Sequence, residues 1–173
     1  MLFLRLMLIA ILSSIAGGAY GQTLWKGTQV GMSIDEVRRA VPEAVDSDYH
    51  NTLPDGAIEQ LIVDVVDVMG KPFHASFYFN GDRLSQVTLR LREPGEGMEA
   101  RVFYDTVREA LHAKYAPMLS TNSTNGMFQN NESTWMNGAT SITLEYSKMT
   151  GSGLPALLTI SYSARVAKAG DNL

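Results

Sequence analysis

Few side chains in this sequence have the types and spacing that catalysis or metal binding requires. The three histidines, His50, His74 and His112, are far apart, and none belongs to a His-x-x-x-His or His-Glu-x-x-His pattern of the kind that binds zinc. Cysteine is absent, which excludes disulfides, thiolate catalysis and zinc–thiolate sites. The sequence therefore predicts no metal site and no cofactor. Histidines gathered beside a carboxylate in the fold would instead indicate a small hydrolase.

Other catalytic patterns are incomplete. No Gly-x-Ser-x-Gly sequence occurs, and the Gly-Ser-Gly at 151–153 is too short to cradle a phosphate, so we interpret it as a loop. Asp64 and Asp67 could form the kind of carboxylate pair that separates two pKa values for acid–base catalysis. Residues three apart in a strand point to opposite faces, so we expect no pairing between them. We predict no catalytic residues.

The first 21 residues have the pattern of an export signal. Arg5 precedes a mostly apolar run from Leu6 to Ile15, broken only by Ser13 and Ser14, and Ala-Tyr-Gly at 19–21 fits a signal-peptidase site. The run is about half of the roughly 20 apolar residues that a membrane-spanning helix needs. We expect cleavage after Gly21 and a periplasmic or secreted mature chain without a membrane span; the alternative is an uncleaved N-terminal anchor.

The mature chain is of a size and charge that limit its partners. It would have 152 residues, with 13 basic and 18 acidic side chains and no basic stripe, so nucleic acid is not an expected partner. The length predicts a single domain over residues 22–163, with halves at 22–93 and 97–163, followed by a flexible tail at 164–173.

The stretch VGMSIDEVRRAVPEA marks the start of a helix rather than a catalytic carboxylate. Ser33 followed three residues later by Glu36 forms a capping box. Val37 and Val41 then lie on one helical face, and Pro42 ends the segment. The pattern predicts a short helix that begins after Ser33.

Alternating apolar and polar residues predict strands in both halves. The first half has an Asn-Gly hairpin turn at 80–81, and a breaker at 93–97 precedes a helix over 98–115 with an apolar stripe. Residues 120–132 are polar and rich in asparagine, which predicts an exposed loop. The predicted strands are residues 61–66, 73–79, 84–92, 133–137, 141–147 and 157–163. The order α-β-β-β-α-β-β-β predicts an α+β fold with helices on an antiparallel sheet, and an imperfect duplication is an option.

Three segments resemble a known family. VGMSIDEVRRAVP, followed by FYFNGDRLSQVTLRL, resembles small outer-membrane proteins of the SmpA/OmlA type and the repeat of the β-lactamase inhibitor protein. LHAKYAPML looks like the helix end of such repeats, although Ala116 stands where the family has glycine. The resemblance covers roughly a third of the mature chain. It implies a helical layer on an antiparallel sheet and protein partners. The chain lacks the family's lipid-anchor cysteine and disulfides, and no functional residue is carried over.

One surface constellation is a candidate binding site. If the apolar sides of the strands face the helices, the opposite sheet face carries an aromatic residue, an arginine and many hydroxyl groups. Tyrosine and arginine are enriched at the energetic centres of protein interfaces, whereas the alternative is an ordinary solvated sheet face. The predicted binding residues are Tyr78, Gln86, Thr88, Arg90, Thr143, Glu145, Thr159 and Ser161. Trp25 and Trp135 are expected to serve packing.

These observations predict an exported, non-enzymatic envelope protein with a protein-binding or structural role. Its partner would be another envelope protein, bound through the open sheet face. Two alternatives remain: a small secreted hydrolase, or an inhibitor of a secreted enzyme that acts through a protruding loop at 121–131.

Overall fold

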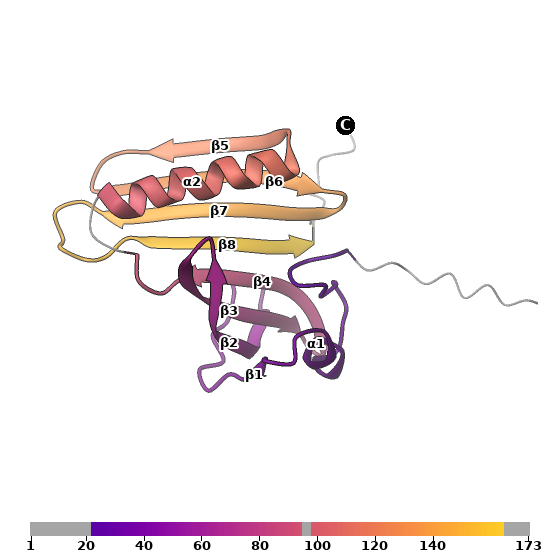
Figure 1. The fold of residues 1–173 in the computed structure, drawn as a ribbon. Coiled ribbons are helices and arrows are strands. Elements are labelled where there is room, and N and C mark those ends of the chain that lie inside the picture. Colours follow the sequence, from indigo (N-terminus) through magenta and orange to yellow (C-terminus); the bar gives the residue numbers. More distant parts are fainter. Residues whose placement is uncertain (1–21, 95–97, 165–173) are drawn as a thin grey trace, which may run out of the picture.

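The computed structural model describes residues 22–94 and 98–164. The expected export signal at 1–21, part of the breaker at 93–97 and the expected tail beyond Ala164 lie outside these residues. Within them, two helices and eight strands follow one another in the chain (Figure 1). Their bounds are α1 Ile34–Ala40, β1 Val45–Asp46, β2 Ile58–Val68, β3 Lys71–Asn80, β4 Arg83–Leu91, α2 Met98–Tyr115, β5 Met118–Thr124, β6 Phe128–Asn137, β7 Thr140–Met149 and β8 Leu157–Ala164.

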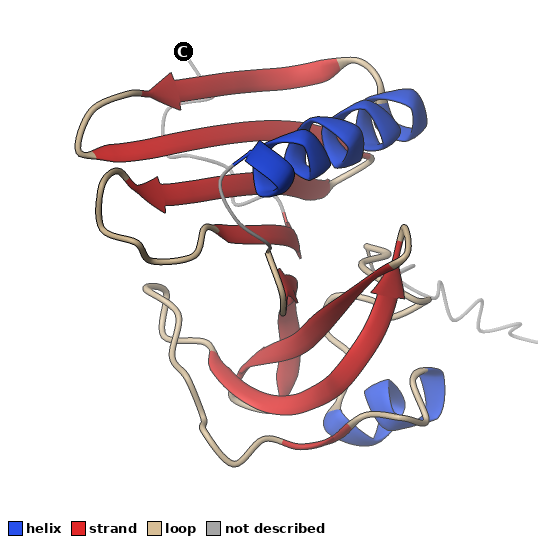
Figure 2. Cartoon of the chain, turned by 60° about the vertical axis from the view of Figure 1, so that its left-hand side comes forward, coloured by secondary structure: helices blue, strands red, loops and turns tan. Residues whose placement is uncertain are grey.

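All eight strands form one antiparallel sheet in the order β1-β2-β3-β4-β8-β7-β6-β5. Each half is a four-stranded meander that follows a helix, and the two halves meet where β4 pairs with β8. The views in Figures 1 and 2 agree that both helices lie on the same side of the sheet, with α2 across β6 and β7. The prediction of helices packed on an antiparallel sheet is therefore confirmed.

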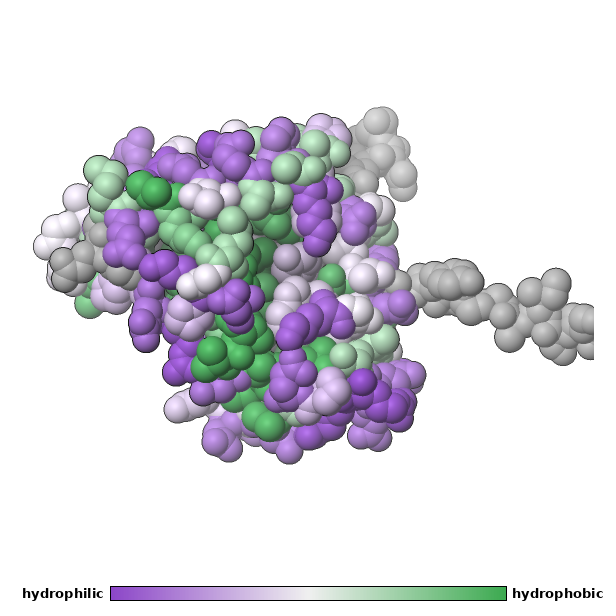
Figure 3. Space-filling model, viewed as in Figure 1, coloured by the Kyte–Doolittle hydropathy of each residue, from purple (hydrophilic) through white to green (hydrophobic). Residues whose placement is uncertain are grey.

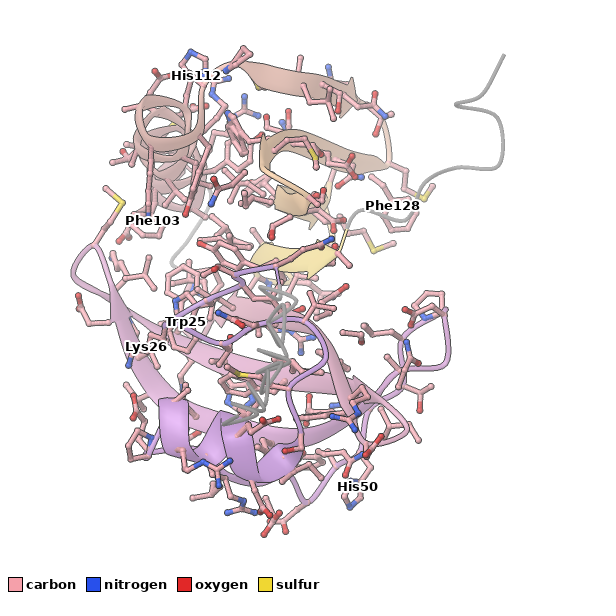
Figure 4. All side chains as sticks on the ribbon, turned by 90° about the vertical axis from the view of Figure 1, so that its right-hand side faces the viewer. Trp25, Lys26, His50, Phe103, His112 and Phe128 are labelled. Atoms are coloured by element: carbon pink, nitrogen blue, oxygen red, sulfur yellow. The ribbon has the colours of Figure 1, made fainter. Side chains whose placement is uncertain are left out.

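The core lies between the helices and one face of the sheet. It is a single cluster that joins buried side chains of both helices to the inward residues of both meanders. Phe77 is fully excluded from solvent, as the alternation in its strand predicted, and so is Trp135, which was expected to serve packing. Figure 4 shows Phe103 beneath α2 and Trp25 between the two helices; the Trp25 ring is 6.1 Å from the Phe77 ring. Both tryptophans thus serve packing.

Apolar surface remains visible between α2 and the first meander on the helix side of the molecule (Figure 3). Phe103 is only partly buried there, and its ring lies 6.2 Å from that of Phe73. Within the described residues, neither helix is long and apolar enough to cross a membrane.

Helix α1 begins as the capping box predicts. The Ser33 N–H donates to Glu36 Oε2 (2.8 Å), and the Glu36 N–H donates to Ser33 Oγ (3.4 Å). The hydrogen bond from the Ser33 backbone is the main reason why the pKa of Glu36 lies below its usual value. The helix ends at Ala40, and Val37 is its fully buried residue.

The strand count in each half is higher than predicted. The polar segment 120–132, expected to be a loop, is instead a hairpin of β5 and the start of β6. Strand β5 lies at the edge of the sheet and pairs only with β6. Backbone pairing on one side is enough to hold it as a strand, so it can consist of polar residues without an apolar face. The two-residue β1 is the opposite edge strand and was too short to give a pattern.

Replacing Ser33 by Ala tests the capping box. The variant loses the side-chain acceptor for the Glu36 N–H, so we expect the free energy of unfolding to fall by about 1 kcal/mol. Urea denaturation measures the change. Ser120→Ala, at an exposed position of β5, is the matched control and should stay within about 0.5 kcal/mol of the parent. Equal losses in the two variants would contradict the capping role.

Candidate functional site on the polar sheet face

The sheet face opposite the helices, called here the polar face, brings all eight predicted binding residues together. They come from β3, β4, β8 and β7, which are consecutive strands of the sheet. The cross-strand partners are Tyr78 with Gln86, Thr88 with Ser161, Arg90 with Thr159, Ser161 with Thr143, and Thr159 with Glu145. Since paired residues point to the same face, the alternation in each strand was sufficient to place them.

A row of hydroxyl groups crosses the centre of the polar face. The pairing register aligns one serine or threonine from each of six neighbouring strands: Ser76, Thr88, Ser161, Thr143, Thr134 and Ser120. The Thr88 and Ser161 hydroxyls are 3.4 Å apart, those of Thr134 and Thr143 are 3.3 Å apart, and Gln86 Nε2 donates to Thr88 Oγ1 (2.9 Å). The row offers donors and acceptors without charge.

Part of the polar face is closed, in contrast to the open surface that we expected. Tyr78 is only 4% exposed, and Thr88 and Thr159 are each 8% exposed. Arg90 is exposed, and the other four predicted residues are half-buried. The accessible part of the face is therefore centred on β4, β8 and β7.

A buried carboxylate, which sequence analysis missed, lies at the closed side. Glu59 is 2% exposed and is the cross-strand neighbour of Tyr78. Ser47 Oγ donates a short hydrogen bond to Glu59 Oε1, and Asn51 Nδ2 donates to Oε2 (3.3 Å). The Glu59 N–H donates to the Asn51 carbonyl (2.8 Å), and His50 Nδ1 is 3.2 Å from the Glu59 carbonyl oxygen. Glu59 thus holds the segment that follows β1 against β2.

The surroundings of Glu59 favour its ionised form. Burial alone would raise the pKa of this carboxyl, but hydrogen bonds from Ser47, Ser76 and Asn51 outweigh burial and lower it, with help from the charge of His74. The pKa of the neighbouring Tyr78 hydroxyl is raised, mainly by burial and to a smaller extent by the charge of Glu59. The predicted strand began at Leu61, but β2 begins at Ile58, with a register shift between Glu59 and Leu61. That irregularity hid Glu59 from the alternation pattern.

A second row carries the charges of the polar face. The register aligns His74, Arg90, Thr159, Glu145 and Glu132 across five neighbouring strands. Burial is the main reason why the pKa of Glu145 is raised, and the charge of Glu132 directly opposite adds to it. The face therefore changes from basic to acidic along this row.

The remaining candidate groups do not form a catalytic cluster. His74 Nδ1 lies 3.7 Å from Asp64 Oδ1, whereas Figure 4 shows His50 and His112 at opposite ends of the molecule. Asp64 accepts a hydrogen bond from Arg92 (2.7 Å), and this bond lowers the pKa of Asp64. Asp67 accepts a hydrogen bond from the Gly70 N–H (3.3 Å). The two aspartates therefore have separate partners. In the described part of the chain, no group of three or more His, Asp or Glu side chains could hold a metal ion.

Comparison with known proteins adds no relative, because no family model, curated protein or solved structure matches the chain.

Glu59→Gln tests the buried carboxylate. The amide cannot accept hydrogen bonds from all the donors that surround the carboxylate, so we expect the free energy of unfolding to fall by about 1–3 kcal/mol at pH 7. A depressed carboxyl pKa stabilises the fold above the ordinary value of 4.5 and loses this effect as the pH falls through the folded-state pKa. The difference between parent and variant should therefore shrink in acid.

Urea denaturation between pH 7 and pH 3 measures this trend. Glu109→Gln, which changes an exposed carboxylate on α2, is the matched control and should have little effect at either pH. A Glu59→Gln deficit that stays constant with pH would contradict the ionised state of Glu59.

Glu145→Gln should change the stability of the fold in the opposite direction to Glu59→Gln. A raised carboxyl pKa means that the folded state disfavours the charge, so stability is lost as the pH rises through the folded-state pKa. At pH 7 the variant should be more stable than the parent by a few tenths to about 1 kcal/mol, and the gain should disappear below pH 4. Thermal denaturation over this range measures the gain. Glu132→Gln should also stabilise the fold, because it removes the same repulsion. The double variant should therefore gain less stability than the two single variants added together.

Proposed function

We propose that this chain is an exported, non-enzymatic envelope protein that binds a protein partner through the accessible part of the polar face. One observation carries the proposal: accessible polar side chains of three consecutive strands, β4, β8 and β7, meet at the junction of the two halves, while both helices cover the opposite face. A surface that spans several strands suits a protein partner.

The chemistry of the accessible surface supports a protein partner. The exposed Arg90 lies beside Thr159 at the centre of the sheet, and arginine is one of the side chains that dominate binding energy at protein interfaces. Its cross-strand partners are the half-buried His74 and the buried Thr159, and the Glu145–Glu132 pair lies further along the same row. A partner would meet a basic position at Arg90 and an acidic position at the Glu145–Glu132 pair. The fixed separation of these charges favours specific binding.

The export signal and the family resemblance support a location in the envelope and a partner there. Both are sequence observations. The resemblance to SmpA/OmlA-type proteins and to the β-lactamase inhibitor repeat implies protein binding by a helix-backed sheet, and it motivates the choice of an envelope extract for the experiment below.

We also infer that the two halves are an imperfect duplication. The support is the symmetry of the strand order, in which each half contributes a helix and a four-stranded meander and the last strands, β4 and β8, pair with each other. The proposed binding surface then spans both copies of the unit, with its centre at their junction.

The two alternative functions have less support. A hydrolase needs a nucleophile or an activated water beside a histidine and a carboxylate. Among the described residues, the histidine–carboxylate pair within ion-pair distance is His74 with Asp64, and Asp64 is exposed. The inhibitor hypothesis relied on a protruding loop at 121–131, and that segment forms the β5–β6 hairpin.

The binding proposal is tested by mutating Arg90. The mature chain, residues 22–173, is used to capture proteins from its own envelope extract, and mass spectrometry identifies a reproducible partner. Calorimetric titration of that partner then compares Arg90→Ala with Arg39→Ala, an exposed arginine of α1 on the other side of the sheet. We expect Arg90→Ala to weaken binding by about tenfold, which corresponds to about 1.4 kcal/mol.

Two results would contradict the proposal. Capture of no partner would argue against protein binding, and equal affinities of the Arg90→Ala variant and the parent would argue against this surface. The Arg39→Ala variant should bind as the parent does, because its side chain lies away from the polar face.

A further inference from the structure

Strand β5 leaves a long edge of the sheet unprotected. It pairs with β6 on one side only, and six of its seven residues are exposed. From Tyr115 to Asn131 the sequence has no charged residue. Sheet proteins commonly block such edges with lysine, proline or very short strands, because a row of unpaired N–H and C=O groups is a template for another strand.

The opposite edge of the same sheet is protected in this way. Strand β1 has only two residues, Val45 and Asp46, so it offers little backbone for pairing. Asp46 also carries a charge at that edge, and its Oδ1 accepts from an Arg38 Nη2 (2.6 Å). The difference between the two edges suggests that β5 is exposed for a purpose.

The side chains of β5 are arranged almost symmetrically about Asn122. Reading outward in both directions, Thr121 matches Ser123, and Ser120 matches Thr124. In an antiparallel pair of identical strands related by a two-fold axis through Asn122, Asn122 would lie opposite itself and each hydroxyl would lie opposite another hydroxyl. Such Thr–Ser pairs stabilise adjacent strands, and the absence of charge removes like-charge repulsion between identical edges.

We propose that β5 pairs antiparallel with β5 of a second copy of this chain, about a two-fold axis through Asn122. The two eight-stranded sheets become one continuous sheet, and the interface is isologous, as in most homodimers. Leu119, which is 65% exposed, then lies opposite Asn125 of the second copy. A strand-edge contact is smaller than a standard protein interface, so the dimer is reversible and depends on concentration.

The near-palindrome is what selects a second copy over an extended segment of another protein. A foreign strand needs only the free backbone groups of β5 and gains nothing from the symmetry of its side chains. Self-pairing uses both features, because the two-fold axis repeats each side-chain pair on both sides of Asn122.

The proposal predicts the effect of a charge at the axis. Asn122→Lys places two ammonium groups opposite each other in the dimer, whereas Thr106→Lys adds the same charge at an exposed position of α2. Analytical ultracentrifugation of the mature chain should show a monomer–dimer equilibrium for the parent and for Thr106→Lys. For Asn122→Lys the dissociation constant should rise by about tenfold or more.

A cross-linking experiment tests the register independently. Because the chain has no cysteine, an Asn122→Cys variant carries a single thiol. Opposite residues in antiparallel strands have Cα atoms about 4.5–5.5 Å apart, which a disulfide can span. We expect mild oxidation to give a covalent dimer much faster for Asn122→Cys than for Thr106→Cys.

Several results would overturn the proposal: a monomer at every concentration, a dimer that Asn122→Lys leaves unchanged, or equal cross-linking rates for the two cysteine variants. Uptake of a foreign peptide strand by a chain that stays monomeric alone would also overturn it. Arg90→Ala should not alter the dimer, so failure of this proposal and failure of the proposed function are distinguishable.

Discussion

The pairing of β4 with β8 is the constraint on which the rest of the structure depends. On the helix side it aligns Val87 with Tyr162 and Leu89 with Ile160, which joins the apolar cores of the two halves. On the other side the same pairing aligns Thr88 with Ser161. A slip by one residue would exchange the two faces of β8 and expose apolar side chains on the polar face. One register therefore determines both a continuous core and a continuous candidate binding surface.

The parts of the fold that sequence analysis predicted are those with strong local patterns. The Ser33–Glu36 capping box, the alternation in β3 and β4, and the apolar stripe of α2 each depend on neighbours within one element. The eight candidate binding residues were also found together because alternation alone assigns a residue to a face. Edge strands β1 and β5 escaped detection, because a strand that pairs on one side and faces water does not need an apolar pattern.

Glu59 could not have been recognised in the same way, because its importance comes from tertiary contacts. Its partners Ser47 and Asn51 belong to a segment that returns across the start of β2, and a register shift follows it in the strand. The consequence for function is a division of the polar face. A closed side is organised by a buried carboxylate, and an accessible side carries Arg90 and Glu145. The binding surface that we propose is therefore narrower than the full sheet.

The connections between the strands have a consequence for how the chain acquires this structure. Within each half, short turns join β2 to β4 and β5 to β7, and β8 follows β7 after a longer loop at 150–156. These contacts therefore form between residues that are near in sequence. In the sequence, β4 and β8 are separated by α2 and by strands β5, β6 and β7. The two strands can therefore pair only after these elements have taken their places. Because distant contacts carry a larger loop-closure cost, we expect the two meanders to form early and their junction to form last, so that the shared polar face exists only in the fully folded chain.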